Sequence, residues 1–192
     1  VRALQIAMAS AADVTFKDVI REACLSRDHF MSWTDTAGSA EVAAAQVSAA
    51  LGVDANDRIE DVEAAIVDGP HLPKSRWAAT AALLEVGSSA DRKQAAKLRE
   101  ALTSTGATQV DDYLEVFLTE GEPRKSLITK KFADNNPALA RSIEQEALRI
   151  GPLIERRRAV TTRDRSQALL HIATAAAANY RREKQERGLL DR

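Results

Sequence analysis

The chain has 192 residues, 45% of them hydrophobic and 4% aromatic, and its 27 basic and 28 acidic side chains give a formal net charge of −1. This composition excludes a disordered chain, a collagen-like fibre and a disulfide scaffold, and it leaves room for one domain or two small ones. Alanine occurs 36 times, against eight glycines and five prolines. Because alanine is the best helix former, the composition favours an all-α fold.

Capping residues and glycines divide the first 121 residues into short helices. In chain order, we expect helices over residues 16–23, 40–51, 59–66, 77–86, 90–102 and 110–117. The residues expected at their N-termini are Asp13 or Thr15, Ser39, Asp54 or Asp57, Ser88 or Ser89, and Thr108. Gly52, Gly69 and Gly87 are expected to end three of them.

Residues 122–192 show a different pattern. A loop over residues 121–123 is expected to lead into a short basic helix over residues 126–132, and Pro137 suits the first turn of the next helix. Apolar residues then recur every three or four positions from Leu139 to Ile154. This spacing predicts two long C-terminal helices, or one helix kinked at Gly151-Pro152. Strand-like alternation is missing, so we expect an irregular multi-helix domain without a sheet.

The sequence carries no recognisable catalytic or metal-binding motif. There is no GxxxxGK[ST] phosphate loop, HExxH or CxxC, and His29, His71 and His171 are scattered along the chain. The single cysteine, Cys24, is interpreted as a small core residue and fits a reducing, cytoplasmic setting. No apolar run has the length needed to span a membrane. We therefore expect no catalytic residue, no metal site and no cofactor in this chain.

The net charge conceals an asymmetry between the two parts of the chain. Residues 1–121 carry 11 basic and 19 acidic side chains, whereas residues 122–192 carry 16 and 9. Four basic clusters lie at residues 124–131, 156–158, 163–165 and 181–184. Such arrays suit phosphate backbones, because each cation neutralises a phosphate and releases counterions. A solvated helix face and an acidic protein partner are the alternative interpretations.

Two segments resemble a known family. The stretches ADRKQAAKLREAL, from residue 90, and VFLTEGEPRKSLITK, from residue 116, resemble bacterial AddA proteins, the helicase–nuclease subunit of the AddAB double-strand break repair complex. Tyr180, Lys184 and the Gly-Leu-Leu-Asp ending at Asp191 are similar to a segment of UvrD-like superfamily 1 helicases, although Arg192 stands where that family has an aromatic residue. In this family such a region is the helical accessory subdomain 1B, inserted in the first RecA-like motor domain.

The resemblance implies a non-catalytic, DNA-facing part of an ATP-dependent DNA helicase and exonuclease. It implies DNA, the motor domains of the same polypeptide and an AddB-type subunit as partners, with ATP and Mg used by the parent enzyme. The start at Val1 rather than Met agrees with a single helical domain, residues 1–192, excised from a longer protein. Its expected subdivision is an acidic part, 1–121, and a basic long-helix part, 122–192.

Six basic residues are the candidates for DNA contact. They are Arg124, Lys125, Lys130 and Lys131, with Arg92 and Lys93 as weaker candidates. Tyr180 and Lys184 share a helix face, and we expect Tyr180 to pack against the core under the Lys184 stem rather than to touch DNA. The alternative function is a free-standing helical protein–protein interaction module, favoured by the apolar stripe from Leu139 to Ile154.

Overall fold

The computed structural model describes residues 38–188, together with Asp18, Arg21, Glu22, Leu25, Ser32 and Thr36. Of the described residues, 77% are helical and 3% lie in strands, which confirms the all-α expectation. In chain order the elements are α4 (Ala40–Ala50), α5 (Ile59–Val67), the 3-10 helix η1 (Lys74–Arg76), α6 (Trp77–Glu85), α7 (Ser89–Thr103), α8 (Gly106–Phe117), β1 (Leu118–Thr119), β2 (Glu122–Pro123), α9 (Lys130–Asn135) and α10 (Pro137–Glu186).

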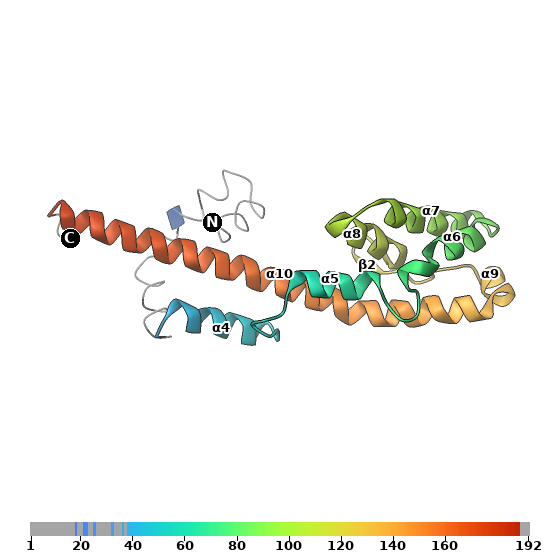
Figure 1. The fold of residues 1–192 in the computed structure, drawn as a ribbon, viewed down its shortest axis with the longest axis horizontal. Helices are drawn as coiled ribbons and strands as arrows, with labels where there is room; N and C mark the ends of the chain where they lie inside the picture. Colours follow the sequence, from blue (N-terminus) through green and yellow to red (C-terminus); the bar gives the residue numbers. More distant parts are fainter. Residues whose placement is uncertain are drawn as a thin grey trace. The chain divides into compact units, whose positions relative to one another are not determined.

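The chain forms two compact units. Unit 1 comprises Val1–Asp57 and Arg158–Arg192, and unit 2 comprises Arg58–Arg157. Helix α10 contributes to both units (Figure 1). The division therefore does not follow the change in charge between residues 121 and 122.

Unit 2 is built around an aromatic core. Helix α7 packs against α6 and α8, and α5 packs against α8 (Figure 1). The Trp77 ring stacks on the Tyr113 ring with centroids 4.3 Å apart, and the Phe117 ring meets Tyr113 edge-on at 5.2 Å. Trp77 and Tyr113 are fully buried, and the Trp77 indole donates a hydrogen bond to the Leu72 carbonyl at 3.0 Å. Three of the chain's eight aromatic residues therefore meet in this core.

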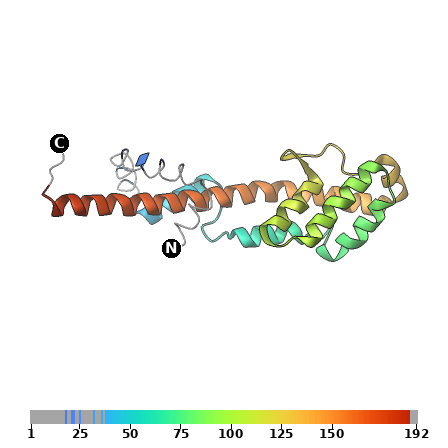
Figure 2. The same ribbon diagram turned by 90° about the horizontal axis from the view of Figure 1, so that it is seen from above.

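Helix α10 is one continuous helix of 50 residues (Figure 2). Pro137 occupies its first position, as expected, where the missing N–H costs no hydrogen bond. Pro152 lies inside the helix and does not end it. In unit 2, the apolar stripe of α10 contributes Ile143 and Ile150 to the core, each at most 4% exposed. Packing of this stripe offsets the one backbone hydrogen bond that Pro152 removes.

Unit 1 packs α4 against the C-terminal part of α10. Ser39 caps α4 as expected, because its side chain accepts a hydrogen bond from the Val42 N–H at 3.2 Å. Ala43, Ala44 and Leu170 form a small apolar cluster between the two helices. Small residues let the helices approach closely, so the alanine-rich composition serves packing as well as helix formation.

Other sequence expectations are wrong in detail. Asp54 and Asp57 do not cap α5, whose N-cap is Arg58. The Asp57 carboxylate accepts from the Asp54 N–H, and the Asp54 carboxylate accepts from the Asn56 N–H, so both side chains stabilise the preceding turn. Helix α8 begins at Gly106 rather than Thr108, and Gln109 ties its start to the end of α7 by donating to the Ala101 and Ser104 carbonyls.

Two expectations for residues 118–132 also need correction. The turn around Gly121 forms a two-stranded antiparallel ladder, β1–β2, whereas no strand was expected. The short basic helix is α9, which spans Lys130–Asn135 rather than residues 126–132. It begins late because Thr129 is its N-cap and is held by a residue of α7. The expected helix over residues 16–23 and Cys24 lie outside the described residues, apart from the isolated positions named above.

Candidate nucleic-acid interface

A buried carboxylate joins the N-termini of α7 and α9. Asp91 is fully buried, and its two oxygens accept four hydrogen bonds, from the backbone N–H and hydroxyl of Ser88 and of Thr129, at 2.7–2.9 Å. The Ser88 hydroxyl in turn accepts from the Asp91 N–H, which completes a capping box at the start of α7. We call Ser88, Asp91 and Thr129 the Asp91 junction.

The hydrogen bonds keep Asp91 charged. Burial alone would raise the pKa of the Asp91 carboxyl, but the hydrogen bonds from Thr129 and Ser88 outweigh burial and hold the pKa below its ordinary value. Gly87 leaves room for this arrangement, since a Cβ at that position would lie 2.7 Å from the Asp91 Cβ. The junction therefore connects two helix starts through hydrogen bonds to one buried carboxylate.

The junction gathers four of the six candidate DNA-contacting residues. Arg92 and Lys93 follow Asp91 near the start of α7, and Lys130 and Lys131 follow Thr129 in α9. All four are exposed. Among the residues that the structure describes, none of the four forms an ion pair with a carboxylate. Two pairs of cations, about 38 residues apart in the sequence, thus lie around one junction.

The other two candidates lie in a different setting. The backbone N–H of Arg124 donates to the Phe117 carbonyl at 2.9 Å, which extends the β1–β2 turn. The Arg124 side chain is half-buried and donates to the Glu115 carbonyl at 3.3 Å. Lys125 is exposed. These two residues belong to the strand turn and not to the Asp91 junction.

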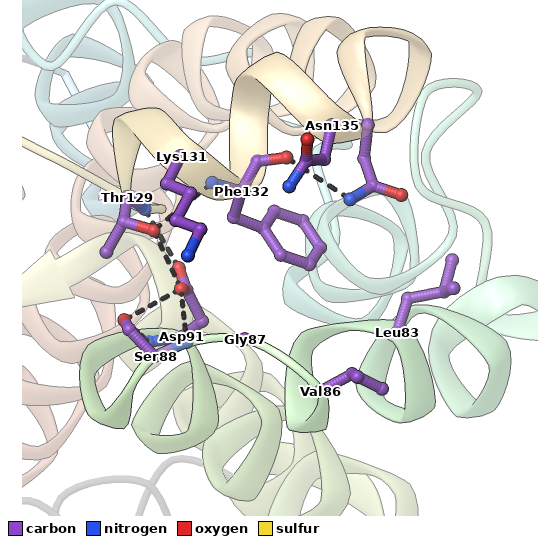
Figure 3. A pocket seen from close by; sticks show the side chains of 10 residues that line it. Leu83, Val86, Gly87, Ser88, Asp91, Thr129, Lys131, Phe132 and Asn135 are labelled. Carbon is purple, nitrogen blue, oxygen red and sulfur yellow. Dashed lines mark hydrogen bonds between the residues drawn. The ribbon is translucent and has the colours of Figure 1, made fainter.

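A pocket opens beside the junction (Figure 3). Its volume is about 580 Å³, and it lies between the end of α6 and α9. Figure 3 shows Lys131, Phe132 and Asn135 of α9 facing Leu83 and Val86 across it. Leu83 is 49% exposed and Val86 87% exposed.

A second buried network lies in the core of unit 2. Glu146 of α10 is fully buried and accepts hydrogen bonds from the Tyr113 hydroxyl at 2.9 Å and from Nε of Arg149 at 2.9 Å. Arg149 also donates to the carbonyls of Ala65 and Ile66 at the end of α5. Burial, and then the nearby Glu146 charge, raise the pKa of Tyr113. This network joins α5, α8 and α10 and explains why a charged pair lies inside the core.

Two arginines of the other basic clusters, Arg157 and Arg163, have structural roles. Arg157 pairs with Glu63 at 2.8 Å and with Asp111 at 2.6 Å, all within unit 2. In unit 1, Arg163 is only 4% exposed and donates to the carbonyls of Asp54 and Asp57. The interpretation of Arg163 as part of a phosphate-binding or solvated array is therefore wrong, because its guanidinium is occupied by the turn before α5.

The structure describes two of the three C-terminal residues that resemble UvrD-like helicases. Tyr180 is 49% exposed, and its packing against the core stays a prediction. Lys184 is half-buried and lies one turn further along α10. Asp191 lies outside the described residues.

Sequence reasoning did not single out Asp91, Glu146 or Arg149. The Ser88-x-x-Asp91 spacing before an apolar helix is a capping-box pattern and could have identified Asp91 as a helix-start residue. Its bonds to Thr129 have no local pattern, because they cross 38 residues. Glu146 and Arg149 have the i, i+3 spacing of an ordinary exposed pair, and nothing in the sequence places them in a core.

Comparisons with known proteins give no identification: no family model, curated protein or solved structure matches the chain. Among the described residues, no three His, Cys, Asp or Glu side chains come together as a metal ion would require. None of the described helices is both long and apolar enough to cross a membrane.

Proposed function

We propose that this chain is a non-catalytic, DNA-binding helical accessory domain of a cytoplasmic ATP-dependent DNA helicase–nuclease that acts in double-strand break repair. In this proposal the motor domains of the same polypeptide use ATP and Mg, and an AddB-type subunit completes the enzyme. The resemblance of residues 90–102 and 116–130 to AddA proteins supports it. The observation that carries it is the set of unpaired cations around the Asp91 junction.

The geometry favours contact with phosphates. The four side chains of Arg92, Lys93, Lys130 and Lys131 are exposed and form no ion pair within the described residues. Their backbones are fixed to one another through the Asp91 junction, so little ordering of the main chain opposes binding. Cations held in this way recognise a phosphate backbone without reading bases. Arg124 and Lys125 remain candidates for additional phosphate contacts from the strand turn.

Burial of the apolar stripe of α10 is evidence against the alternative function, a protein interaction module. That alternative depended on an apolar surface from Leu139 to Ile154 being available to a partner helix. In unit 2 the structure buries Ile143 and Ile150 of this stripe in the domain's own core. We therefore favour the DNA-binding proposal.

The test is the salt dependence of binding to a labelled DNA duplex. We expect Lys130→Ala/Lys131→Ala and Arg92→Ala/Lys93→Ala each to weaken binding equally for unrelated sequences. The slope of log affinity against log salt should fall by about 0.7–0.9 for each phosphate contact removed.

A matched control removes the same charge elsewhere in unit 2. Arg76→Ala/Arg141→Ala changes two exposed arginines outside the Asp91 junction. If this control lowers affinity and slope as much as the two junction variants, binding follows net charge alone and the proposed interface is wrong. If none of the variants changes the slope, the junction cations are solvated surface.

A further inference from the structure

The pocket beside the Asp91 junction has one apolar and one polar wall. Leu83 and Val86 form the apolar side, and the Phe132 ring lies between them and Lys131 (Figure 3). Asn135 and Lys131 supply polar groups from α9. A volume of about 580 Å³ lies within the range of about 300–1,000 Å³ typical of pockets for small organic groups.

The polar groups of the pocket that form no hydrogen bond within the described residues indicate which ligand it could bind. Asp91 lines the pocket, but it is fully buried and its oxygens already accept four hydrogen bonds from Ser88 and Thr129. The Asn136 amide nitrogen donates to the Phe132 carbonyl at 3.2 Å. The Asn135 amide, by contrast, forms no hydrogen bond within the described residues, so its donor and its acceptor are both available. The Lys131 ammonium group likewise forms no ion pair there.

We propose that this pocket receives an unpaired base of single-stranded DNA while Lys130 and Lys131 hold the adjacent phosphates. This inference rests on the proposed function and adds the form of DNA that the site selects. An apolar wall with a neighbouring amide is the environment in which extruded bases bind, with the amide pairing to the donor and acceptor on the base edge. A base inside a duplex cannot enter the pocket, because it is stacked and paired.

An acidic, apolar peptide is the other ligand with matching groups. Its carboxylate could use the lysines and its backbone amide could pair with Asn135, but its apolar side chain and its carboxylate lie on different residues. A nucleotide satisfies the apolar wall, the amide and the cation together, since base and phosphate are joined in one unit. An acidic peptide is the competing outcome of the test.

The experiment uses the full chain and three fluorescein-labelled probes of equal length: a single strand of mixed sequence, the same strand without bases, and the duplex. We expect the single strand to bind about tenfold more tightly than the other two, which corresponds to about 1.4 kcal/mol. Leu83→Ser/Val86→Ser and, separately, Asn135→Ala should abolish most of this preference. Both variants change exposed or half-exposed side chains, so the fold should be retained.

Leu148→Ser is the matched control. Leu148 is 79% exposed on α10 in the same unit and does not line the pocket. If the baseless strand binds as well as the intact strand, or if the pocket variants behave like Leu148→Ser, the base pocket is wrong. The proposed phosphate interface would still stand if Lys130→Ala/Lys131→Ala weakened binding to all three probes.

A synthetic peptide of alternating acidic and leucine residues tests the competing ligand. The proposal fails if three results occur together: the peptide displaces the single strand from the wild-type chain, the peptide no longer binds Leu83→Ser/Val86→Ser, and the single strand binds that variant as well as wild type. The pocket would then bind protein. The proposal is supported if the peptide binds all variants equally.

Discussion

Removing the Glu146 carboxylate should destabilise unit 2 strongly. Glu146 is fully buried and accepts hydrogen bonds from Tyr113 and Arg149. In Glu146→Ala the guanidinium of Arg149, whose side chain is only 20% exposed, loses its counter-ion. The Tyr113 hydroxyl retains only a long contact of 3.5 Å to the Leu72 carbonyl.

The size of this destabilisation depends on which hydrogen bonds Arg149 keeps in the variant. Breaking a buried ion pair by removing one partner costs about 3–5 kcal/mol. Arg149 still donates to the Ala65 and Ile66 carbonyls, which places the expected loss near the lower end, about 3 kcal/mol. Replacing both charges by apolar groups, as in Glu146→Leu/Arg149→Met, should cost less than Glu146→Ala, because no unpaired charge remains.

Urea unfolding followed by circular dichroism measures these differences. The control is Glu85→Ala, which breaks an ion pair with Arg99 that is about half exposed on both sides and should cost about 0.2–1 kcal/mol. A loss in Glu146→Ala no larger than in Glu85→Ala would refute the reasoning. So would a double variant that is less stable than the single one, because the unpaired charge would then not be the cause.

Two further predictions concern the other buried charges. Asp91→Asn should lower the free energy of unfolding at neutral pH, and the difference from wild type should shrink below about pH 4. The reason is that the fold lowers the pKa of Asp91. The stability that the charged carboxylate contributes is therefore complete above the unfolded pKa of about 3.9 and is lost as the pH falls through the folded pKa. Urea unfolding near pH 7 and near pH 3 checks this, and a difference that grows in acid would contradict it. Arg163→Ala should speed amide exchange in the turn over residues 51–57, because it frees the Asp54 and Asp57 carbonyls. Exchange measured by mass spectrometry should stay unchanged in that turn for the exposed control Arg165→Ala.

Much of the helical structure could be predicted from local sequence. Ser39 and Ser88 cap α4 and α7 as their positions indicate, and Pro137 begins α10. These features depend on contacts within three or four residues, which a sequence displays directly. The start of α9 could not be predicted in this way, because Thr129 is fixed by Asp91 on another helix.

The candidate site likewise has a part that the sequence predicts and a part that depends on the fold. The sequence identified Arg92, Lys93, Lys130 and Lys131 as basic residues but could not show that the starts of α7 and α9 are joined at one junction. That outcome depends on the Asp91 junction, whose hydrogen bonds link residues far apart in the chain. The pocket beside it also needs the end of α6 and the start of α9 to lie opposite each other (Figure 3).

The sequence by itself determined an all-α chain with a distinct basic C-terminal part, because helix propensity, capping and charge are properties of residues and their near neighbours. Only the tertiary structure decided which charges are available. It buried Arg163 and Glu146 in networks that satisfy them and left the lysines of α9 exposed beside a pocket. The physical reason is that a charge can be buried only where distant segments bring it compensating partners, and such partners are set by the fold rather than by local sequence.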